Sequence, residues 1–587
     1  MAEISDPGRG EYTKDGSVDL KGNPVLRSKR GGWTACYFLV VYEVFERMAY
    51  YGISSNLVLY LTRKLHQGTV ASSNNVTNWV GAVWMTPVIG AYVADAHLGR
   101  YWTFIIASFI YLSGMCLLTL AVSLPSLRPQ PCGPNTGDPT CSKNATPMQL
   151  GFFYAALYIL AVGTGGTKAN ISTIGADQFD VFDSRERSQK LSFFNWWMFS
   201  IFFGTFFANT VVVYVQDNVG WTLGYGLPTI GIALSFAIFI AGTPFYRHRL
   251  PSGSPFTKMA RVLVAAARKW TVPLPSDPKE LHELDSDAYA VDGVYRIDST
   301  PSLSFLNKAA VKSGPTSPWM LCTVTQVEET KQMVHMIPIL IATFVPGAML
   351  TQVGTLFVKQ GTMLDRHIGP RFQVPPASLS AFVTFSMLIS VFCYDRFLVP
   401  FMRRRTNNPR GISLLQRMGA GIMLHILVML TAAITERYRL SAAREHGVVE
   451  SGGMVPMTIF LLLPQYVLMG VADALLEAAK LEFFYDQAPE GMKSLGTSYF
   501  STSLGVGNFV SSFMLSTAER ITKRNGRGGW IQNNLNASRL DYYYGFFTAL
   551  NCANLAFFLL VSRFYVYRAE VISESKDAVG EEKDVVA

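Results

Sequence analysis

Three charged residues lie close together in an otherwise apolar stretch near the start of the chain. Between Tyr42 and Gly52, Glu46 and Arg47 follow Glu43 by three and four residues. On a helix, this spacing places Glu43 beside the other two on one face. Two carboxylates that share one guanidinium at low dielectric constant cannot both ionise easily, so the group can take up and release a proton. The pattern indicates a proton-binding site; the alternative is a buried ion pair that only ties helices together.

A lone cation and two further acids lie in other apolar stretches. Lys168 follows a glycine-rich run, 163–166, where small residues allow close helix packing. Its ammonium either meets a partner or reaches toward water at the end of its helix. Asp473 and Glu477 are one helical turn apart. With Arg47, the set suits a zwitterion, whose carboxylate and amino group each meet an opposite charge; a plain anion fits if Asp473 pairs only within the protein.

Four uncharged side chains are candidates to line the same cavity. They are Tyr50, Tyr51, Asn195 and Gln352. Ordinary packing is the alternative for each aromatic residue, because Tyr and Trp are also common where membrane helices meet water.

The apolar stretches that carry these residues are long enough to cross a membrane. Of the 587 residues, 49% are hydrophobic and only 16% are charged, whereas soluble proteins average about 25% charged residues. A membrane-spanning helix needs about 20 mostly apolar residues. We predict about twelve spans: 33–61, 79–94, 102–124, 150–171, 193–215, 221–245, 333–357, 379–399, 419–435, 457–484, 499–515 and 544–566. Stretches of this length exclude a membrane β-barrel.

Polar segments divide the chain into five predicted parts. The parts are a cytoplasmic tail (1–32), a first group of six helices (33–245), a cytoplasmic loop between the halves (246–331), a second group of six helices (332–567) and a cytoplasmic tail (568–587). The loop between the halves is rich in Pro, Ser, Asp and Lys, and we expect it to be a connection and not a domain.

Basic residues set the predicted orientation. Lys and Arg are frequent in the first tail, at the start of the loop between the halves and at 403–410, and such residues favour the cytoplasmic side. Basic residues at 523–527 run against this trend. On the opposite side we predict a disulfide between Cys132 and Cys141 and glycosylation at Asn144. We favour the plasma membrane over the vacuolar membrane.

Composition and motifs also bear on the class of function. The net charge of +9 follows from basic residues at helix ends, and no nucleic-acid motif accompanies it. No cluster of His, Cys and Asp and no Ser–His pairing stands out, so we predict neither an enzyme nor a bound metal or cofactor. We favour a carrier driven by a proton gradient, with a small molecule and protons as partners, that is a monomer or a weak dimer. A receptor that binds without transport is the alternative, but it could lose the acids that this chain retains.

Several motifs resemble one transporter family. The segment Asp95–Arg100 resembles the loop signature of the major facilitator superfamily. Four further segments, Glu43–Tyr51, 165–168, 175–180 and 193–197, are similar to those of the proton-coupled oligopeptide transporters, in particular the plant nitrate and peptide transporter family. The resemblance extends over residues 32–567.

The resemblance implies an all-α membrane protein with the major facilitator fold. We expect about twelve transmembrane helices in two six-helix bundles around a central cavity, with alternating access. By position, Glu43, Glu46 and Arg47 are expected to couple transport to protons. Lys168 is expected to take part in coupling and to bind a carboxylate, and Asp473 to bind an amino terminus.

Three departures from the family pattern bear on the substrate. Asp473 replaces the longer Glu usual in peptide carriers, and Glu477 can compensate. Leu350 stands where some relatives have a His that binds nitrate, and Thr351 stands near the place of an acid that pairs with the lysine in peptide carriers. We therefore expect di- and tripeptides as substrates, with nitrate, another organic anion, a hormone or a glycoside as the alternative.

Overall fold

The protein is mostly helical. The computed structural model describes residues 12–567 except 14, 131–144, 181, 252, 285–295, 371, 407–410 and 524–527. The predicted disulfide residues Cys132 and Cys141 and the predicted glycosylation site Asn144 lie outside the described residues.

The first half consists mostly of long helices. Its α-helices are α1 (Gly32–Ser54), α2 (Leu57–Arg63), α3 (Thr69–Val93), α4 (Gly99–Ser123), α5 (Pro147–Ala176), α6 (Ser184–Phe207) and α7 (Trp221–Ala241). Its π-helical turns are η1 (Ala94–Leu98), η4 (Ala208–Val212) and η5 (Val215–Val219), and its 3-10 turns are η2 (Pro125–Leu127) and η6 (Thr243–Phe245).

The second half has the same character but more interruptions. Its α-helices are α10 (Val324–His335), α11 (Ile337–Ala342), α12 (Phe344–Leu350), α13 (Leu356–Gly361), α14 (Ser380–Cys393), α15 (Val399–Thr406), α16 (Leu414–Glu445), α17 (Leu463–Gln487), α18 (Lys493–Thr522) and α19 (Leu540–Arg563). A π-helical turn, η11 (Tyr394–Leu398), joins α14 to α15, and the 3-10 turns are η9 (Thr351–Gly354), η10 (Pro376–Leu379), η12 (Ile459–Leu462) and η13 (Glu490–Met492).

The seventh span is a broken helix, and proline chemistry accounts for the break. Its two parts, Val324–Ala342 and Phe344–Gly361, meet at 44°. Pro346 has no N–H to donate to the carbonyl of Ala342, one turn earlier. Asn554 of α19 donates its side-chain amide to that carbonyl at 2.8 Å. The freed backbone group is therefore satisfied by a neighbouring helix, as the membrane interior requires.

The segment between the halves, predicted to be a loop, contains helices with a small core of their own. Helix α8 (Pro255–Arg268) and the 3-10 turn η8 (Ser304–Ala310) pack against α10, while η7 (Pro278–Glu280) lies between them in sequence. Buried apolar residues join these elements, among them Val262, Leu306 and Val327. Helix α10 begins before the expected start of the second half at 332, because its polar first turns are satisfied locally: Lys331 donates to Glu328 at 2.6 Å.

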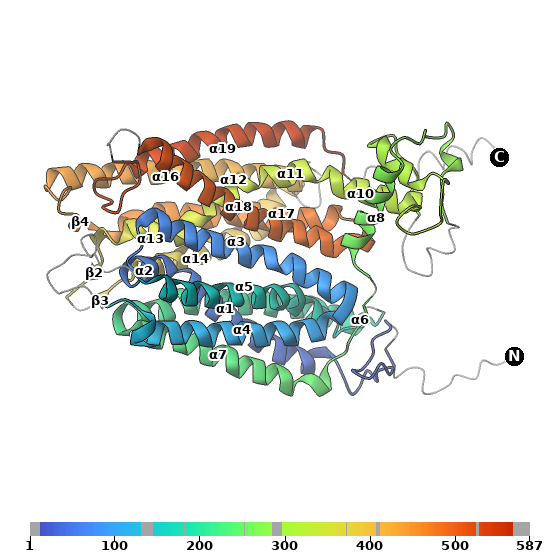
Figure 1. Cartoon of the computed structure of the whole chain (residues 1–587), viewed down its shortest axis with the longest axis horizontal. Helices are drawn as coiled ribbons and strands as arrows, with labels where there is room; N and C mark the ends of the chain where they lie inside the picture. The colour runs from blue at the N-terminus through green and yellow to red at the C-terminus, as the bar shows by residue number, and fades with distance from the viewer. Residues whose placement is uncertain are drawn as a thin grey trace.

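Four short strands of the described residues lie at the end of the molecule opposite α8 (Figure 1). Strand β1 (Leu364–Asp365) pairs in parallel with β4 (Val455–Thr458), and β2 (His367–Ile368) pairs antiparallel with β3 (Phe372–Gln373). Each pair is a two-stranded sheet that joins loops.

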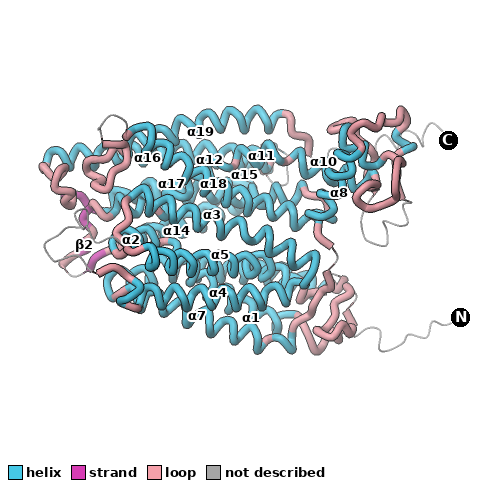
Figure 2. The backbone as a smooth tube through the Cα atoms, viewed as in Figure 1, coloured by secondary structure: helices cyan, strands magenta, loops and turns pink. Residues whose placement is uncertain are grey.

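The long helices run side by side, and the two halves form neighbouring groups (Figures 1 and 2). In the first half, α5 packs on α3 and α4, and α1 packs on α6 and α7. In the second half, α16 packs on α17 and α19, and α14 packs on α17. Helices α3 and α18 pack against each other at the boundary between the halves.

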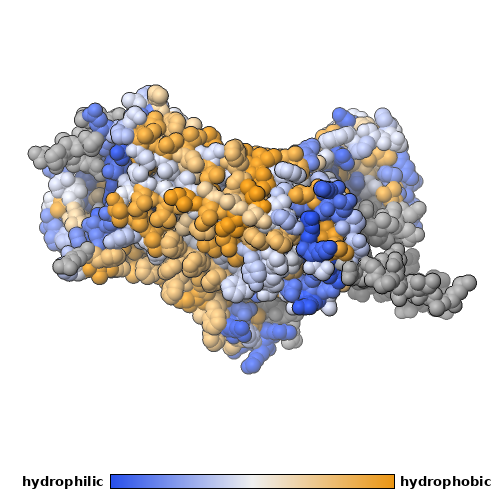
Figure 3. Space-filling view, turned by 90° about the horizontal axis from the view of Figure 1, so that it is seen from below, coloured by the Kyte–Doolittle hydropathy of each residue, from blue (hydrophilic) through white to orange (hydrophobic). Residues whose placement is uncertain are grey.

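The surface has a broad apolar band between polar ends, as a membrane protein requires (Figure 3). Within the described residues, eight helical segments are long and apolar enough to span a membrane, and the bent pair α10–α13 makes a ninth. One of the eight, Thr69–Ser123, contains both α3 and α4. Adding α1 and α18, whose charged and polar residues lower their hydropathy, gives the twelve crossings predicted from the sequence.

Candidate functional site

The three charged residues of α1 form one buried ion cluster. Arg47 Nε lies 2.6 Å from Glu43 Oε1 and 2.9 Å from Glu46 Oε2, and all three side chains are buried. Glu43 Oε2 and both carboxylate oxygens of Glu46 have no hydrogen-bond partner among the described residues. One guanidinium therefore faces two carboxylates, an arrangement that can bind one proton.

A glycine on the neighbouring helix makes room for this cluster. A Cβ at Gly204 of α6 would lie 2.5 Å from the Val44 carbonyl oxygen and 2.9 Å from Arg47 Cβ. Because neither backbone nor Cβ can move aside easily, the missing side chain lets α6 lie directly against the face of α1 that bears Arg47.

Glycines also fix the position of Lys168 on α5, as the sequence indicates. A Cβ at Gly165 would lie 2.8 Å from the Thr86 carbonyl oxygen of α3, and one at Gly163 would lie 2.4 Å from the Tyr111 amide nitrogen of α4. Helix α5 can therefore approach both neighbours closely only because these positions lack side chains.

The ammonium of Lys168 lies between two aromatic faces. Its Nζ is 3.7 Å from the ring centroid of Tyr50 and 4.7 Å from that of Trp84, and the ring of Tyr51 packs on Tyr50 at 4.9 Å. Within the part of the chain that the structure describes, Nζ has no hydrogen-bond partner. Aromatic faces stabilise a cation but satisfy none of its N–H groups, so this ammonium can still accept a carboxylate as its partner.

In the second half, Asp473 and Glu477 of α17 each have a basic neighbour. Asp473 Oδ1 lies 3.2 Å from Nε2 of His425 on α16, and Glu477 Oε2 lies 2.7 Å from Lys480 Nζ. His425 and Lys480 are fully buried. Sequence reasoning missed His425 as a functional residue, although a single histidine inside the apolar run 421–429 is the kind of ionisable residue that marks a membrane site.

Aromatic rings lie between the charged groups of the two halves at the α3–α18 contact. The ring of Trp84 on α3 lies 6.3 Å from that of Phe500 on α18, edge to face, and Lys480 Nζ lies 5.1 Å from the Phe500 ring. Asp473 interacts electrostatically with Tyr51 of the first half. Trp84 and Phe500, which the sequence analysis did not single out, thus link the surroundings of Lys168 to those of Glu477.

The two remaining candidates, Gln352 and Asn195, differ in their contacts. Gln352 in η9 donates from Nε2 to Ser511 at 3.2 Å and to Thr351 at 3.1 Å, and its Oε1 has no partner among the described residues. Asn195 is exposed on α6, and no hydrogen bond in the described structure joins it to the other candidates. The structure therefore does not bring Asn195 into the cluster.

At the end of the molecule that carries the strands, an ion pair joins the halves. Asp217 lies 2.8 Å from Arg63 of the first half and 3.1 Å from Arg366 of the second. Nearby, the rings of Tyr214 and Phe372 stack at 5.6 Å. At the opposite end, Ser494 donates to Asp95 of the loop signature at 3.1 Å. The strand end is thus closed by charge and stacking together.

We expect Asp217→Asn to open the strand end, because it removes the charge that holds both arginines. A half-buried pair of this kind contributes about 1 kcal/mol, which is about a fivefold change in the population of the open form. The measurement is the labelling rate of Thr355→Cys, a buried position beside η9, by a membrane-impermeant thiol reagent. Asp365→Asn, at an exposed acid of the same end, is the control. Equal rates with and without Asp217→Asn would contradict a latch at this position.

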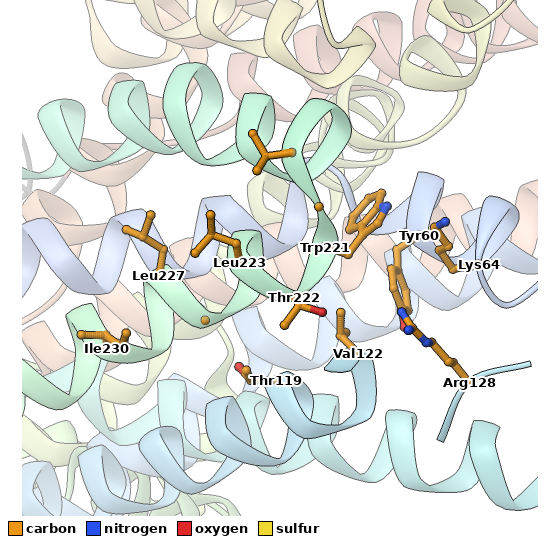
Figure 4. Close-up of a pocket in the computed structure, with 13 residues that line it drawn as sticks. Tyr60, Lys64, Thr119, Val122, Arg128, Trp221, Thr222, Leu223, Leu227 and Ile230 are labelled. Carbon is orange, nitrogen blue, oxygen red and sulfur yellow. The ribbon is translucent and has the colours of Figure 1, made fainter. Parts of the chain in front are cut away.

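A cavity of about 640 Å³ lies away from these residues, between α2, α4 and α7 (Figure 4). Its wall is apolar along α7, at Leu223, Leu227 and Ile230, with Lys64 and Arg128 at one end (Figure 4). None of the predicted substrate-binding residues lines it. We do not regard it as part of the candidate site.

The helical halves, the apolar band and the charged groups buried at their boundary define a multi-pass membrane transporter. The chain belongs to the POT family, whose sequence pattern matches residues 101–531, more than half of its length. It is 65% identical to "Protein NRT1/ PTR FAMILY 5.2" of Arabidopsis thaliana over 562 residues, which cover 96% of each chain. It is 64% identical to "Protein NRT1/ PTR FAMILY 5.3" of the same organism, covering 96% of this chain and 95% of that one.

Among solved structures, the fold is similar to that of an auto-inhibited POT family peptide transporter. The TM-score is 0.67 at 20% identity, and the match covers 91% of this chain and 98% of that one. These comparisons confirm the predicted family, the predicted class of transporter and the predicted two-bundle fold. The roles of individual site residues stay predictions.

Proposed function

We propose that the protein is a proton-coupled symporter of di- and tripeptides that works by alternating access. The observation that carries the proposal is the Lys168 ammonium, which lies between Tyr50 and Trp84 without a hydrogen-bond partner in the described structure. It lies in the electrostatic field of the Glu43–Arg47–Glu46 cluster. A buried cation in this setting is stabilised by an arriving carboxylate, and its own charge in turn affects how readily the acids of α1 hold a proton.

The proposed division of labour follows from which charges are already paired. Arg47 faces two carboxylates, so Lys168 is the better ligand for a substrate carboxylate. We assign proton coupling to Glu43 and Glu46 with Arg47 and Lys168. In the second half we assign the substrate ammonium to Asp473, which lies against His425 through Oδ1. No bound cofactor or enzymatic step is needed for this cycle.

A second candidate is a symporter of organic anions. It is favoured by the contacts of α17, because Asp473 lies against His425 and Glu477 against Lys480. If these pairs stay intact during transport, neither Asp473 nor Glu477 is free to bind an ammonium, and Lys168 selects the substrate.

The proposed placement in the cell follows from the basic residues at helix ends. We propose two six-helix halves, 33–245 and 332–567, joined by a cytoplasmic segment, with both termini in the cytoplasm and the plasma membrane as the site of action. The start of α1 and the end of α19 lie at the same end of the molecule, beside α8 (Figure 1), which supports termini on one side. Arg403, Arg404 and Arg405 of α15 supply further positive charge.

We expect Asp473→Asn to harm dipeptide transport much more than transport of a simple anion. Loss of a charged hydrogen bond to the substrate ammonium costs about 1.5–3 kcal/mol, which corresponds to about a tenfold to hundredfold loss of apparent affinity. The measurement compares uptake of labelled dialanine with that of N-acetylated dialanine, which keeps the carboxylate but has no ammonium. Asp395→Asn, at an exposed acid of η11, is the control. Equal loss with both substrates would remove the ammonium role of Asp473.

A further inference from the structure

His425 is a buried histidine whose two ring nitrogens both face acceptors. Its Nδ1 lies 2.9 Å from the carbonyl oxygen of Gly421, one turn earlier on α16, and its Nε2 lies 3.2 Å from Asp473 Oδ1 on α17. The side chain of His425 is 1% exposed and that of Asp473 is 6% exposed. The ring is therefore shielded from water and meets the rest of the site through Asp473.

The two contacts differ in energy between the possible protonation states of the pair. A carbonyl oxygen and an ionised carboxylate can only accept hydrogen bonds, whereas a neutral imidazole has only one N–H to donate. With a neutral ring and an ionised Asp473, one of the two contacts would bring lone pairs together. Two arrangements avoid this: an imidazolium beside an ionised Asp473, or an imidazole protonated at Nδ1 beside a protonated Asp473. Both contain one proton more than the neutral ring with the ionised acid.

The basic groups that the structure places near Asp473 on α16 and α17 have contacts of their own. On α17, Glu477 is paired with Lys480. On α16, Arg417 donates to the Ala474 carbonyl oxygen at 2.9 Å and lies over the Tyr394 ring. From α19, the uncharged Asn551 donates to the Ile422 carbonyl oxygen.

The remaining elements packed against α16 leave this conclusion unchanged. Helix α12, the turn η12 and strand β4 contain no ionisable residue. From the first half, Tyr51 interacts electrostatically with Asp473. The charge of Asp473 is thus compensated by its partner on α16.

We propose that His425 and Asp473 form a second proton-binding site, separate from the cluster of α1, whose proton is displaced when the ammonium of a substrate binds Asp473. The inference rests on the proposed function, since it concerns the same Asp473. An arriving ammonium supplies the positive charge that the shared proton provides in the empty site, so the proton leaves and His425 returns to the neutral form. A substrate that has no ammonium leaves the proton in place.

The first experiment counts the protons released when substrate binds to the purified protein. Calorimetry in buffers of different ionisation enthalpy gives this number for dialanine and for N-acetylated dialanine. Subtracting the proton count for the acetylated analogue from that for dialanine removes the protons released through the carboxylate and the α1 cluster. We expect dialanine to release about one proton more than its acetylated analogue in the unmodified protein. We expect the difference to vanish in His425→Gln, which keeps an amide donor near Asp473 but cannot titrate.

His335→Gln, the same change at an exposed histidine of α10, is the matched control and should keep the difference. The same release from His425→Gln as from the unmodified protein would overturn the displacement. If neither His425→Gln nor His425→Asn folds, the proton count of the unmodified protein for the two substrates still decides, because equal release contradicts the proposal.

The second experiment tests the shared proton without any substrate. In the described structure, the histidine–aspartate pairs are His367 with Asp365 and His425 with Asp473. Solid-state NMR of 15N-histidine and 13C-aspartate in a His367→Gln background therefore selects the second pair. We expect a ring protonated at both nitrogens or at Nδ1 alone. A neutral ring protonated at Nε2 alone would contradict the shared proton. If dialanine does not bind while the NMR result holds, the peptide proposal fails and the proton site stands.

Discussion

Glu46→Gln is expected to abolish uphill accumulation of substrate while leaving exchange of labelled for unlabelled substrate partly intact. Each pH unit of gradient is worth about 1.4 kcal/mol per proton, or about tenfold accumulation. The Glu46 carboxylate shares Arg47 with Glu43. With a neutral amide at position 46, Glu43 is the one carboxylate paired with Arg47, and it stays ionised without binding a proton. Substrate binding and the motion of the halves do not need this proton. The measurement is uptake into proteoliposomes with and without an imposed pH gradient.

The matched control is Glu450→Gln, which makes the same change at an exposed acid. It should accumulate substrate as the unmodified protein does. Gradient-driven accumulation that persists in Glu46→Gln would show that this carboxylate does not couple transport to protons. Loss of exchange together with accumulation would instead assign Glu46 a structural role.

Lys168→Gln is expected to weaken binding of substrates through their carboxylate. The ammonium has two aromatic faces beside it and no hydrogen-bond partner in the described structure. A charged hydrogen bond to the substrate contributes about 1.5–3 kcal/mol, so we expect apparent affinity to fall about tenfold to hundredfold. Lys168→Arg should not restore it, because a planar guanidinium has a different shape and hydrogen-bond geometry between the rings of Tyr50 and Trp84.

Substrate variants make this test specific to the carboxylate. A dipeptide with an amidated carboxy terminus should bind the unmodified protein weakly, and Lys168→Gln should weaken it no further. Lys308→Gln is the matched control, because Lys308 Nζ also lies over a tryptophan ring, that of Trp270, but in the segment between the halves. Equal weakening of the free and amidated dipeptides by Lys168→Gln would contradict a direct contact with the carboxylate.

Local features of the site could be predicted from the sequence. The ion cluster of α1 is such a case, because its members are three and four residues apart and any helix brings them together. The close packing around Lys168 is another, since Gly163 and Gly165 leave few alternatives for a membrane helix. Twelve spans followed from the length and apolar character of the stretches.

Contacts between distant helices could not be predicted in this way. His425 meets Asp473, and Trp84 meets Phe500, only because α16 packs on α17 and α3 on α18. The sequence around one residue of each pair does not indicate which distant residue it contacts. For the same reason the exposure of Asn195 on α6 was not foreseen: its position on the helix surface depends on which faces α1 and α5 cover.

The bend of the seventh span could be predicted only in part from the sequence. A break at Pro346 is foreseeable, because proline removes a backbone donor wherever it occurs. The stabilising partner is not, since Asn554 reaches the free Ala342 carbonyl from the last helix of the chain. The helices within the segment 246–331 could not be predicted, because their apolar residues are few. These residues form a core only when α8, η8 and α10 pack together.

The most direct test of proton-coupled peptide transport is the current of voltage-clamped oocytes that express the protein, recorded at acidic external pH. Dipeptides are added first and nitrate second, with water-injected oocytes as the reference. We expect an inward current with dipeptides that shrinks as the external pH rises, and no current with nitrate. A current with nitrate alone, or none with either substrate despite confirmed surface expression, would contradict it.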